Sequence, residues 1–186
     1  MSAGPWETAF SLRDEHEISR NTLLTTIPLL KKEWKVSFEF KATSYQRSLA
    51  QILHLTAGGK GLGSGSKYGD RTPAIWTSGS SRFLISSAVN GRVSFGKYVR
   101  PVPSAGEWTT IEIGQESVGS KVVYSITIGG KKVFSTTNSK PSAFENVKVY
   151  ASSSWYSPVS GFIKNLLIEN RNYGETIQDF YQVFQS

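Results

Sequence analysis

The stretch from Val147 to Ile168 decides the fold that this chain is expected to adopt. It reads VKVYA, then the polar loop SSSWYSPVS, then GFIKNLLI. The first segment alternates apolar and polar residues with the period of a strand that buries one face, and the last returns as a second strand opening on a glycine. Trp155 and Tyr156 therefore belong to the loop between two strands.

The same alternation recurs along the rest of the chain. The clearest case is residues 33–42, where Trp34, Val36, Phe38 and Phe40 fall on one face. The Asn90-Gly91 and Gly129-Gly130 pairs favour tight hairpin turns. We read further strands at 6–12, 22–30, 48–56, 72–76, 82–89 and 92–99. Short strands separated by turns predict an all-β protein, an antiparallel two-sheet β-sandwich of the jelly-roll kind.

Several local features refine this prediction. Residues 14–17 are expected to form a charged turn, and the strand over 22–30 is expected to stop near Pro28 because proline cannot donate to a ladder. The strand at the N-terminus is expected to pair with the one near Leu167. Helical spacing of Ile177, Phe180, Tyr181 and Phe184 favours a short C-terminal helix over a closing strand.

Length and composition limit the classes of protein. A chain of 186 residues with 38% apolar and 19% charged residues predicts a single globular domain over 1–186. The net charge of +7 favours anionic partners. The absence of cysteine excludes disulfides and thiolate chemistry. Residues 1–13 carry no signal peptide. We expect a secreted protein, whose signal has then been removed, with the cytosol as the alternative.

Several segments together resemble a laminin-G-like, concanavalin-A-like domain of the animal extracellular type. The matching signs are the strands WKVSFEF at 34–40 and QILHL at 51–55, Trp108 opening a strand, the hairpin ITIGGK at 126–131, and the closing GFIKNL at 161–166. This superfamily contains lectins, cell-adhesion modules and glycanases, so the resemblance implies a binding or glycan-related function without choosing among them.

The resemblance does not extend to a calcium site. Related extracellular domains usually carry an Asp-Pro pair in the loop before the Trp-Tyr pair, where this chain has Ser153 and Ser154. Only three aspartates occur in the chain, Asp14, Asp70 and Asp179, so a cage of oxygen ligands is hard to assemble. We expect neither a metal nor a cofactor.

Catalytic patterns are weak as well. A glycanase of this fold needs acidic residues at alternate positions of one strand, whereas Glu112 is followed by Gly114 and then Glu116. The glycine-rich run over 58–67 lacks the Gly-Lys-Ser/Thr ending of a phosphate-binding loop. His54 is expected to be a hydrogen-bonded core or interface residue. Basic residues occur as scattered pairs, which makes nucleic acid an unfavoured partner. We therefore expect no catalytic residues and no enzyme.

Aromatic and forked polar residues gather in loops, where function is concentrated. Aromatic rings pack against the C–H faces of sugars, and Asp and Arg hydrogen-bond hydroxyl or anionic groups. The alternatives are that Trp76 is a core residue and that Asp70 pairs with Arg71 to fix a turn. The expected ligand-binding residues are Tyr68, Asp70, Arg71, Trp76, Trp155 and Tyr156.

Three functions follow from these residues. The first is a carbohydrate-binding module, with anionic glycans as a possible ligand class because the chain is basic. The second is an adhesive domain that binds extracellular protein or forms a homo-oligomer through exposed sheet surfaces. The third and least favoured is a glycan hydrolase.

Overall fold

A computed structural model describes residues 4–58 and 67–171, and this part of the chain folds into strands joined by turns and loops. It contains no helix of the length and apolarity that a membrane span requires. The strands are β1 (Trp6–Leu12), β2 (His16–Glu17), β3 (Leu23–Leu30), β4 (Glu33–Ser44), β5 (Leu49–Thr56), β6 (Ala74–Ser78), β7 (Arg82–Val89), β8 (Arg92–Val99), β9 (Thr109–Val118), β10 (Lys121–Ile128), β11 (Lys131–Thr137), β12 (Phe144–Tyr150) and β13 (Ser160–Arg171).

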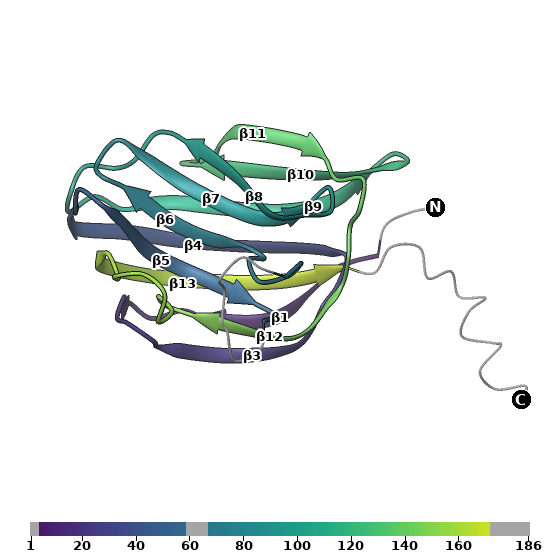
Figure 1. Ribbon diagram of the computed structural model, residues 1–186, viewed down its shortest axis with the longest axis horizontal. Helices are drawn as coiled ribbons and strands as arrows, with labels where there is room; N and C mark the ends of the chain where they lie inside the picture. Colours follow the sequence, from purple (N-terminus) through teal and green to yellow (C-terminus); the bar gives the residue numbers. More distant parts are fainter. Residues whose placement is uncertain (1–3, 59–66, 172–186) are drawn as a thin grey trace, which may run out of the picture.

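The strands form two stacked antiparallel sheets, as the sequence predicts. Sheet A has the order β1-β13-β4-β9-β10-β11, with β2 also paired to β13, and sheet B has the order β3-β12-β5-β6-β7-β8. In Figure 1 β5 and β6 of sheet B cross in front of β4, and β7 crosses in front of β9. The architecture is an antiparallel β-sandwich.

The core lies between the sheets and uses one face of each strand. Trp34, Val36, Phe38 and Phe40 of β4 are at most 2% exposed, which confirms the period-two prediction for this strand. They meet inward side chains of sheet B, for example in the edge-to-face contact between Phe40 and Phe83. Alternation therefore assigns the residues between these core positions to the two outer faces.

The stretch from Val147 to Ile168 joins the two sheets. β12 lies in sheet B between β3 and β5, whereas β13 lies in sheet A between β1 and β4. Gly161 enters β13 where a side chain has no room, because a Cβ atom there would lie 2.3 Å from the carbonyl oxygen of Lys41. The loop carrying Trp155 and Tyr156 thus crosses one end of the sandwich.

Most local expectations are met. Asn90 and Gly91 have φ values of 57° and 73°, and Gly129 and Gly130 have 57° and 77°, as tight hairpin turns require. Phe10 pairs with Ile168 and Leu12 with Leu166, which confirms the predicted partner of the first strand.

Two local expectations are wrong. β3 continues through Pro28 to Leu30, because β3 is an edge strand and its register with β12 joins Ile27 and Leu29 to Val147 and Glu145 without using the proline. The charged segment at 14–17 is not only a turn, since His16 pairs with Ile163 of β13. The expected C-terminal helix and most of the glycine-rich run lie outside the described residues.

Candidate functional site

The outer face of sheet B is the side of that sheet turned away from the core. Ile75, Phe83 and Ile85 point into the core, so their neighbours along β6 and β7 point outward. Strand register places the outward residues in two rows across the sheet. Row one is Gln51, Trp76, Leu84 and Tyr98, and row two is Tyr150, His54, Ala74, Ser86 and Gly96.

Arg71 reaches across this face from the loop that precedes β6. Its Nη1 donates a hydrogen bond to the hydroxyl of Ser94 on β8, and its guanidinium carbon lies 5.2 Å from the ring centroid of Trp76 on β6. The side chain therefore spans β6 to β8, which the small residues of row two permit. Among the described residues Arg71 forms no ion pair, so the predicted alternative of a pair with Asp70 does not occur.

Trp76 is the buried residue against which Arg71 and the loop of Tyr156 pack. It is 1% exposed, and its ring meets Tyr156 edge-to-face with 5.3 Å between the ring centroids. Tyr156 is half-buried, whereas its neighbour Trp155 is 46% exposed. The two loops that carry Arg71 and Tyr156 thus both contact one indole.

Three donor atoms on this face are buried without an acceptor in the described part of the chain. They are Nε2 of Gln51, Nε of Arg71 and Nε1 of Trp76. Leaving a buried donor unpaired has a free-energy cost. A water molecule placed against such a donor would remove that cost.

His54 is buried in β5 and connects the loop of Asp70 with the loop of Ser153. Its Nε2 donates to the carbonyl oxygen of Asp70 at 2.7 Å, and its Nδ1 lies 3.1 Å from the hydroxyl of Ser153. Ser153 in turn lies 2.8 Å from Oε1 of Gln51 through the same hydroxyl. His54 is 1% exposed, which confirms the prediction of a buried, hydrogen-bonded histidine.

Burial keeps this histidine neutral. Loss of solvation lowers the pKa of His54 from 6.5 to about 4. The hydrogen bond to the Asp70 carbonyl and the charge of Asp70 act in the opposite direction, and the charge of Arg71 lowers the pKa further. The neutral ring can hold both loops at ordinary pH.

Tyr68 and Asp70 hold the loop that precedes β6 in place. The hydroxyl of Tyr68 donates to the carbonyl of Lys140 at 2.8 Å, and its ring packs against Phe144, so burial raises the pKa of Tyr68. Asp70 is 3% exposed and its carboxylate accepts from the backbone N–H of Lys67 at 3.0 Å. Of the six expected binding residues, the structure brings Arg71, Trp76 and Tyr156 into contact, and Trp155 precedes Tyr156 in the same loop.

Sequence comparisons give no match to this chain. No protein-family model matches the sequence, and no curated protein sequence matches it. Solved structures do match. The CBM40 module of a Ruminococcus gnavus IT-sialidase superposes with a TM-score of 0.61 at 11% identity, covering 96% of this chain and 100% of that one. The same module bound to α2,3 sialyllactose gives a TM-score of 0.60 at 11% identity, covering 87% and 92%.

Two animal proteins are also similar in structure. A SAP-like pentraxin from Limulus polyphemus has a TM-score of 0.55 at 13% identity, covering 84% of this chain and 76% of that one. The LG4-5 domains of the mouse laminin α1 chain have a TM-score of 0.53 at 13% identity, covering 87% and 43%. The fold is a concanavalin-A-like jelly roll. The resemblance read from the sequence is therefore confirmed at the level of the fold.

Glu112 and Glu116, the acidic residues considered above as catalytic candidates, lie on β9 of sheet A. Glu116 contacts Lys35 at 3.9 Å and Arg171 at 3.7 Å. Glu112 lines a shallow pocket of about 340 Å³ together with Glu39, which is paired with Lys164 at 3.5 Å.

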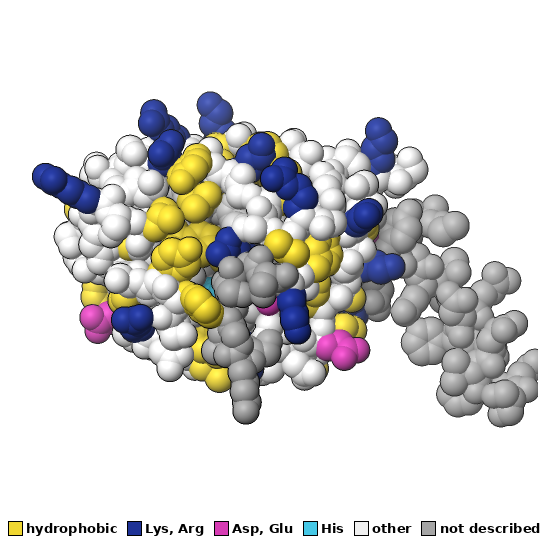
Figure 2. Space-filling view, in the orientation of Figure 1, with side chains coloured by type: hydrophobic (Ala, Val, Ile, Leu, Met, Phe, Trp, Pro, Cys, Tyr) yellow, Lys and Arg dark blue, Asp and Glu magenta, His cyan; other side chains and the backbone are white. Residues whose placement is uncertain are grey.

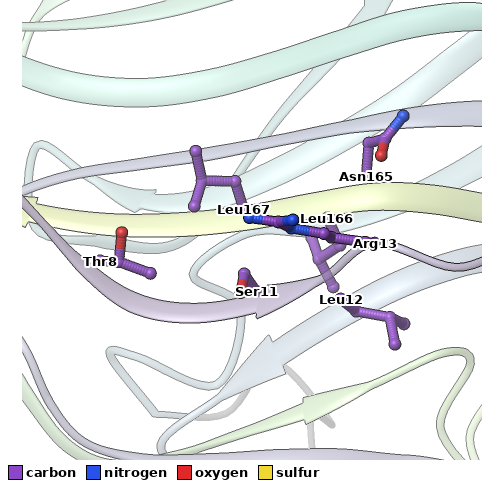
Figure 3. A pocket seen from close by; sticks show the side chains of 7 residues that line it. All are labelled: Thr8, Ser11, Leu12, Arg13, Asn165, Leu166 and Leu167. Atoms are coloured by element: carbon purple, nitrogen blue, oxygen red, sulfur yellow. The ribbon is translucent and has the colours of Figure 1, made fainter.

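A second pocket on sheet A, of about 300 Å³, lies between β1 and β13 of the jelly roll (Figure 3). Thr8 and Ser11 border it from β1, and Asn165 from β13. Asn165 has a φ of 50° and donates from its side chain to Glu39 at 2.6 Å.

Within residues 4–58 and 67–171 no group of three or more His, Asp or Glu side chains could hold a metal ion.

The sequence-based selection omitted residues that share the outer face with Arg71. Leu84 and Tyr98 continue row one beyond Trp76, and Arg82 lies with its guanidinium carbon 4.0 Å from the ring centroid of Tyr98. Alternation along 82–86 places Arg82 and Leu84 on the side opposite the core residues Phe83 and Ile85, whereas the place of Tyr98 follows from the pairing of β7 with β8. Figure 2 shows a band of hydrophobic side chains over β5–β7 with Lys and Arg around it.

Proposed function

We propose that this chain is a non-catalytic carbohydrate-binding module that acts outside the cell. Its ligand would lie on the outer face of sheet B and contact Arg71, Tyr156 and Trp155. Trp76 supports these residues from beneath, and Tyr68 and Asp70 position the loop that carries Arg71. The observation that carries the proposal is the Arg71 guanidinium, held against Trp76 without an ion pair to a carboxylate among the described residues.

The physical reason lies in the chemistry of the exposed groups. An exposed indole and a half-exposed phenol offer flat apolar surfaces for the C–H faces of sugar rings. A guanidinium whose position is fixed offers directed donors to hydroxyl or anionic oxygens. A module of the same fold has been solved with sialyllactose, an acidic sugar, which supports the proposal.

Charge distribution favours an anionic glycan. The strands of sheet B carry the basic residues Arg82, Arg92 and Lys148 besides Lys97, which lies over Phe134 of sheet A, against the single acidic residue Glu145. The basic side chains of sheet A are different, because several are paired with carboxylates, as Lys35 is with Glu116. The positive potential of sheet B is therefore less neutralised by neighbours, which attracts anionic ligands.

Replacing Trp155 tests the site. We expect Trp155→Ala to weaken glycan binding at least fivefold while the free energy of unfolding changes by less than about 0.5 kcal/mol, because the ring is exposed and contributes mainly to a ligand contact. The measurement is titration calorimetry with glycans chosen from an array that includes neutral, carboxylated and sulfated sugars.

The matched control is Val118→Ala. Val118 is also an exposed apolar residue, at 59%, but it lies on β9 in sheet A. Its replacement should leave glycan binding unchanged. Equal affinities for wild type and Trp155→Ala, or no binding to any glycan on the array, would contradict the proposal.

An adhesive role is the second candidate, and edge strand β3 favours it. Leu23 and Leu29 on this strand are 49% and 41% exposed, and an exposed apolar edge can pair with another chain. Sedimentation across a concentration range distinguishes the two functions. Association that Leu29→Lys abolishes would support adhesion, whereas a monomer at every concentration would exclude self-assembly.

A further inference from the structure

A second guanidinium on the outer face of sheet B repeats the arrangement around Arg71. Arg82 is exposed, and its guanidinium carbon lies 4.0 Å from the ring centroid of Tyr98, which is itself 52% exposed. Arg82 forms no ion pair and no side-chain hydrogen bond within the described residues. Stacking on the ring limits where the guanidinium can lie while its donors stay open to a ligand.

The two guanidinium groups belong to one continuous surface. Trp76 pairs with Leu84, and Leu84 pairs with Tyr98, so the rings under Arg71 and Arg82 are the two ends of an apolar row across β6, β7 and β8. Two interstrand spacings separate β6 from β8, which places the rings about 10 Å apart. Rings on strands two positions apart favour a ligand of more than one sugar.

We propose that Arg82 and Tyr98 form a second subsite for an anionic group, and that the ligand is an extended acidic glycan lying across β6–β8. Arg71 binds one anionic group, Leu84 and the exposed ring of Tyr98 contact sugar faces, and Arg82 binds an anionic group on another sugar. This inference rests on the proposed function, because it uses the same face. It adds a ligand class, a polymer or oligomer with anionic groups on separate sugars.

Replacing Arg82 provides the test, with dextran sulfate, hyaluronan and uncharged dextran as probes. Dextran sulfate and hyaluronan separate sulfate from carboxylate as the anionic group, and dextran is the uncharged match for dextran sulfate. Arg82→Gln removes the guanidinium and keeps a polar side chain. The control is Lys131→Gln on β11 of sheet A, which removes one positive charge far from the outer face of sheet B.

We expect Arg82→Gln to lower the affinity for at least one acidic polymer about tenfold, as the loss of one charge-assisted contact predicts. Lys131→Gln should lower it less than twofold. The loss should shrink as salt is raised, because salt screens the contact at an exposed site. Uncharged dextran should bind both variants and wild type equally weakly.

The other outcomes separate this inference from the proposed function. Equal losses in Arg82→Gln and Lys131→Gln would mean unspecific attraction to a basic protein and would overturn the second subsite. Binding that depends on Trp155 and not on Arg82 would also overturn the second subsite and leave the proposed function standing. Failure of every charged and uncharged glycan to bind would overturn both.

Discussion

Trp76→Ala should lower the free energy of unfolding by about 3–5 kcal/mol, the range for removing a large buried aromatic side chain. Trp76 projects from the outer face of sheet B rather than from the core, yet it is only 1% exposed because Arg71 and Tyr156 cover it. Its removal would leave a cavity beneath two loops. We therefore expect that replacing this outer-face residue lowers the free energy of unfolding as much as replacing a residue of the core.

Chemical denaturation of three variants measures this effect. Trp76→Phe should lose less stability than Trp76→Ala, because the phenyl ring fills part of the space. Trp155→Ala serves as the exposed-tryptophan control, at 46% exposure, and should change stability by less than about 0.5 kcal/mol. A loss below about 1 kcal/mol in Trp76→Ala would contradict the view that this indole supports both loops.

Acidification should destabilise the protein through His54. The pKa of this residue is about 4 in the folded protein and 6.5 when unperturbed. Between pH 6.5 and pH 4, His54 is therefore protonated in the unfolded chain but largely neutral in the folded protein. Stability linked to this histidine is fully present above pH 6.5 and is lost as the pH falls toward 4, by about 3 kcal/mol in total.

Comparison with His54→Gln isolates that contribution, because the carboxylates titrate in both proteins. Denaturation curves at intervals between pH 7 and pH 4 should show wild type losing about 3 kcal/mol more than the variant. The variant is less stable at pH 7 if the links to Asp70 and Ser153 hold the two loops. Parallel stability profiles would show that His54 takes up its proton equally in the folded and unfolded states.

The sequence predicted the sheets well because burial imposes a period of two that can be read directly. Trp34 to Phe40 alternates without exception, and the hairpin at Asn90-Gly91 needs the positive φ values that those residues tolerate. The prediction failed at Pro28, where alternation along the strand gives no sign of whether that strand lies at an edge. Edge position is a property of the whole sheet.

The candidate site was predicted less completely, for a similar reason. Arg71, Trp76 and Tyr156 were singled out as loop or near-loop residues, but their contact depends on two loops about eighty residues apart in the sequence meeting over β6. Arg82 and Tyr98 were overlooked because each looks like an ordinary strand residue. Only the register between β7 and β8 shows that they share a face with Arg71.

The central claim is that the outer face of sheet B receives a glycan. Backbone amide NMR of the labelled protein, titrated with an acidic oligosaccharide, tests it most directly. The account predicts the largest shift changes at Arg71, Leu84 and Tyr156, with small changes at Glu39 and Glu112 on sheet A. Changes confined to sheet A, or to the exposed edge of β3, would contradict it.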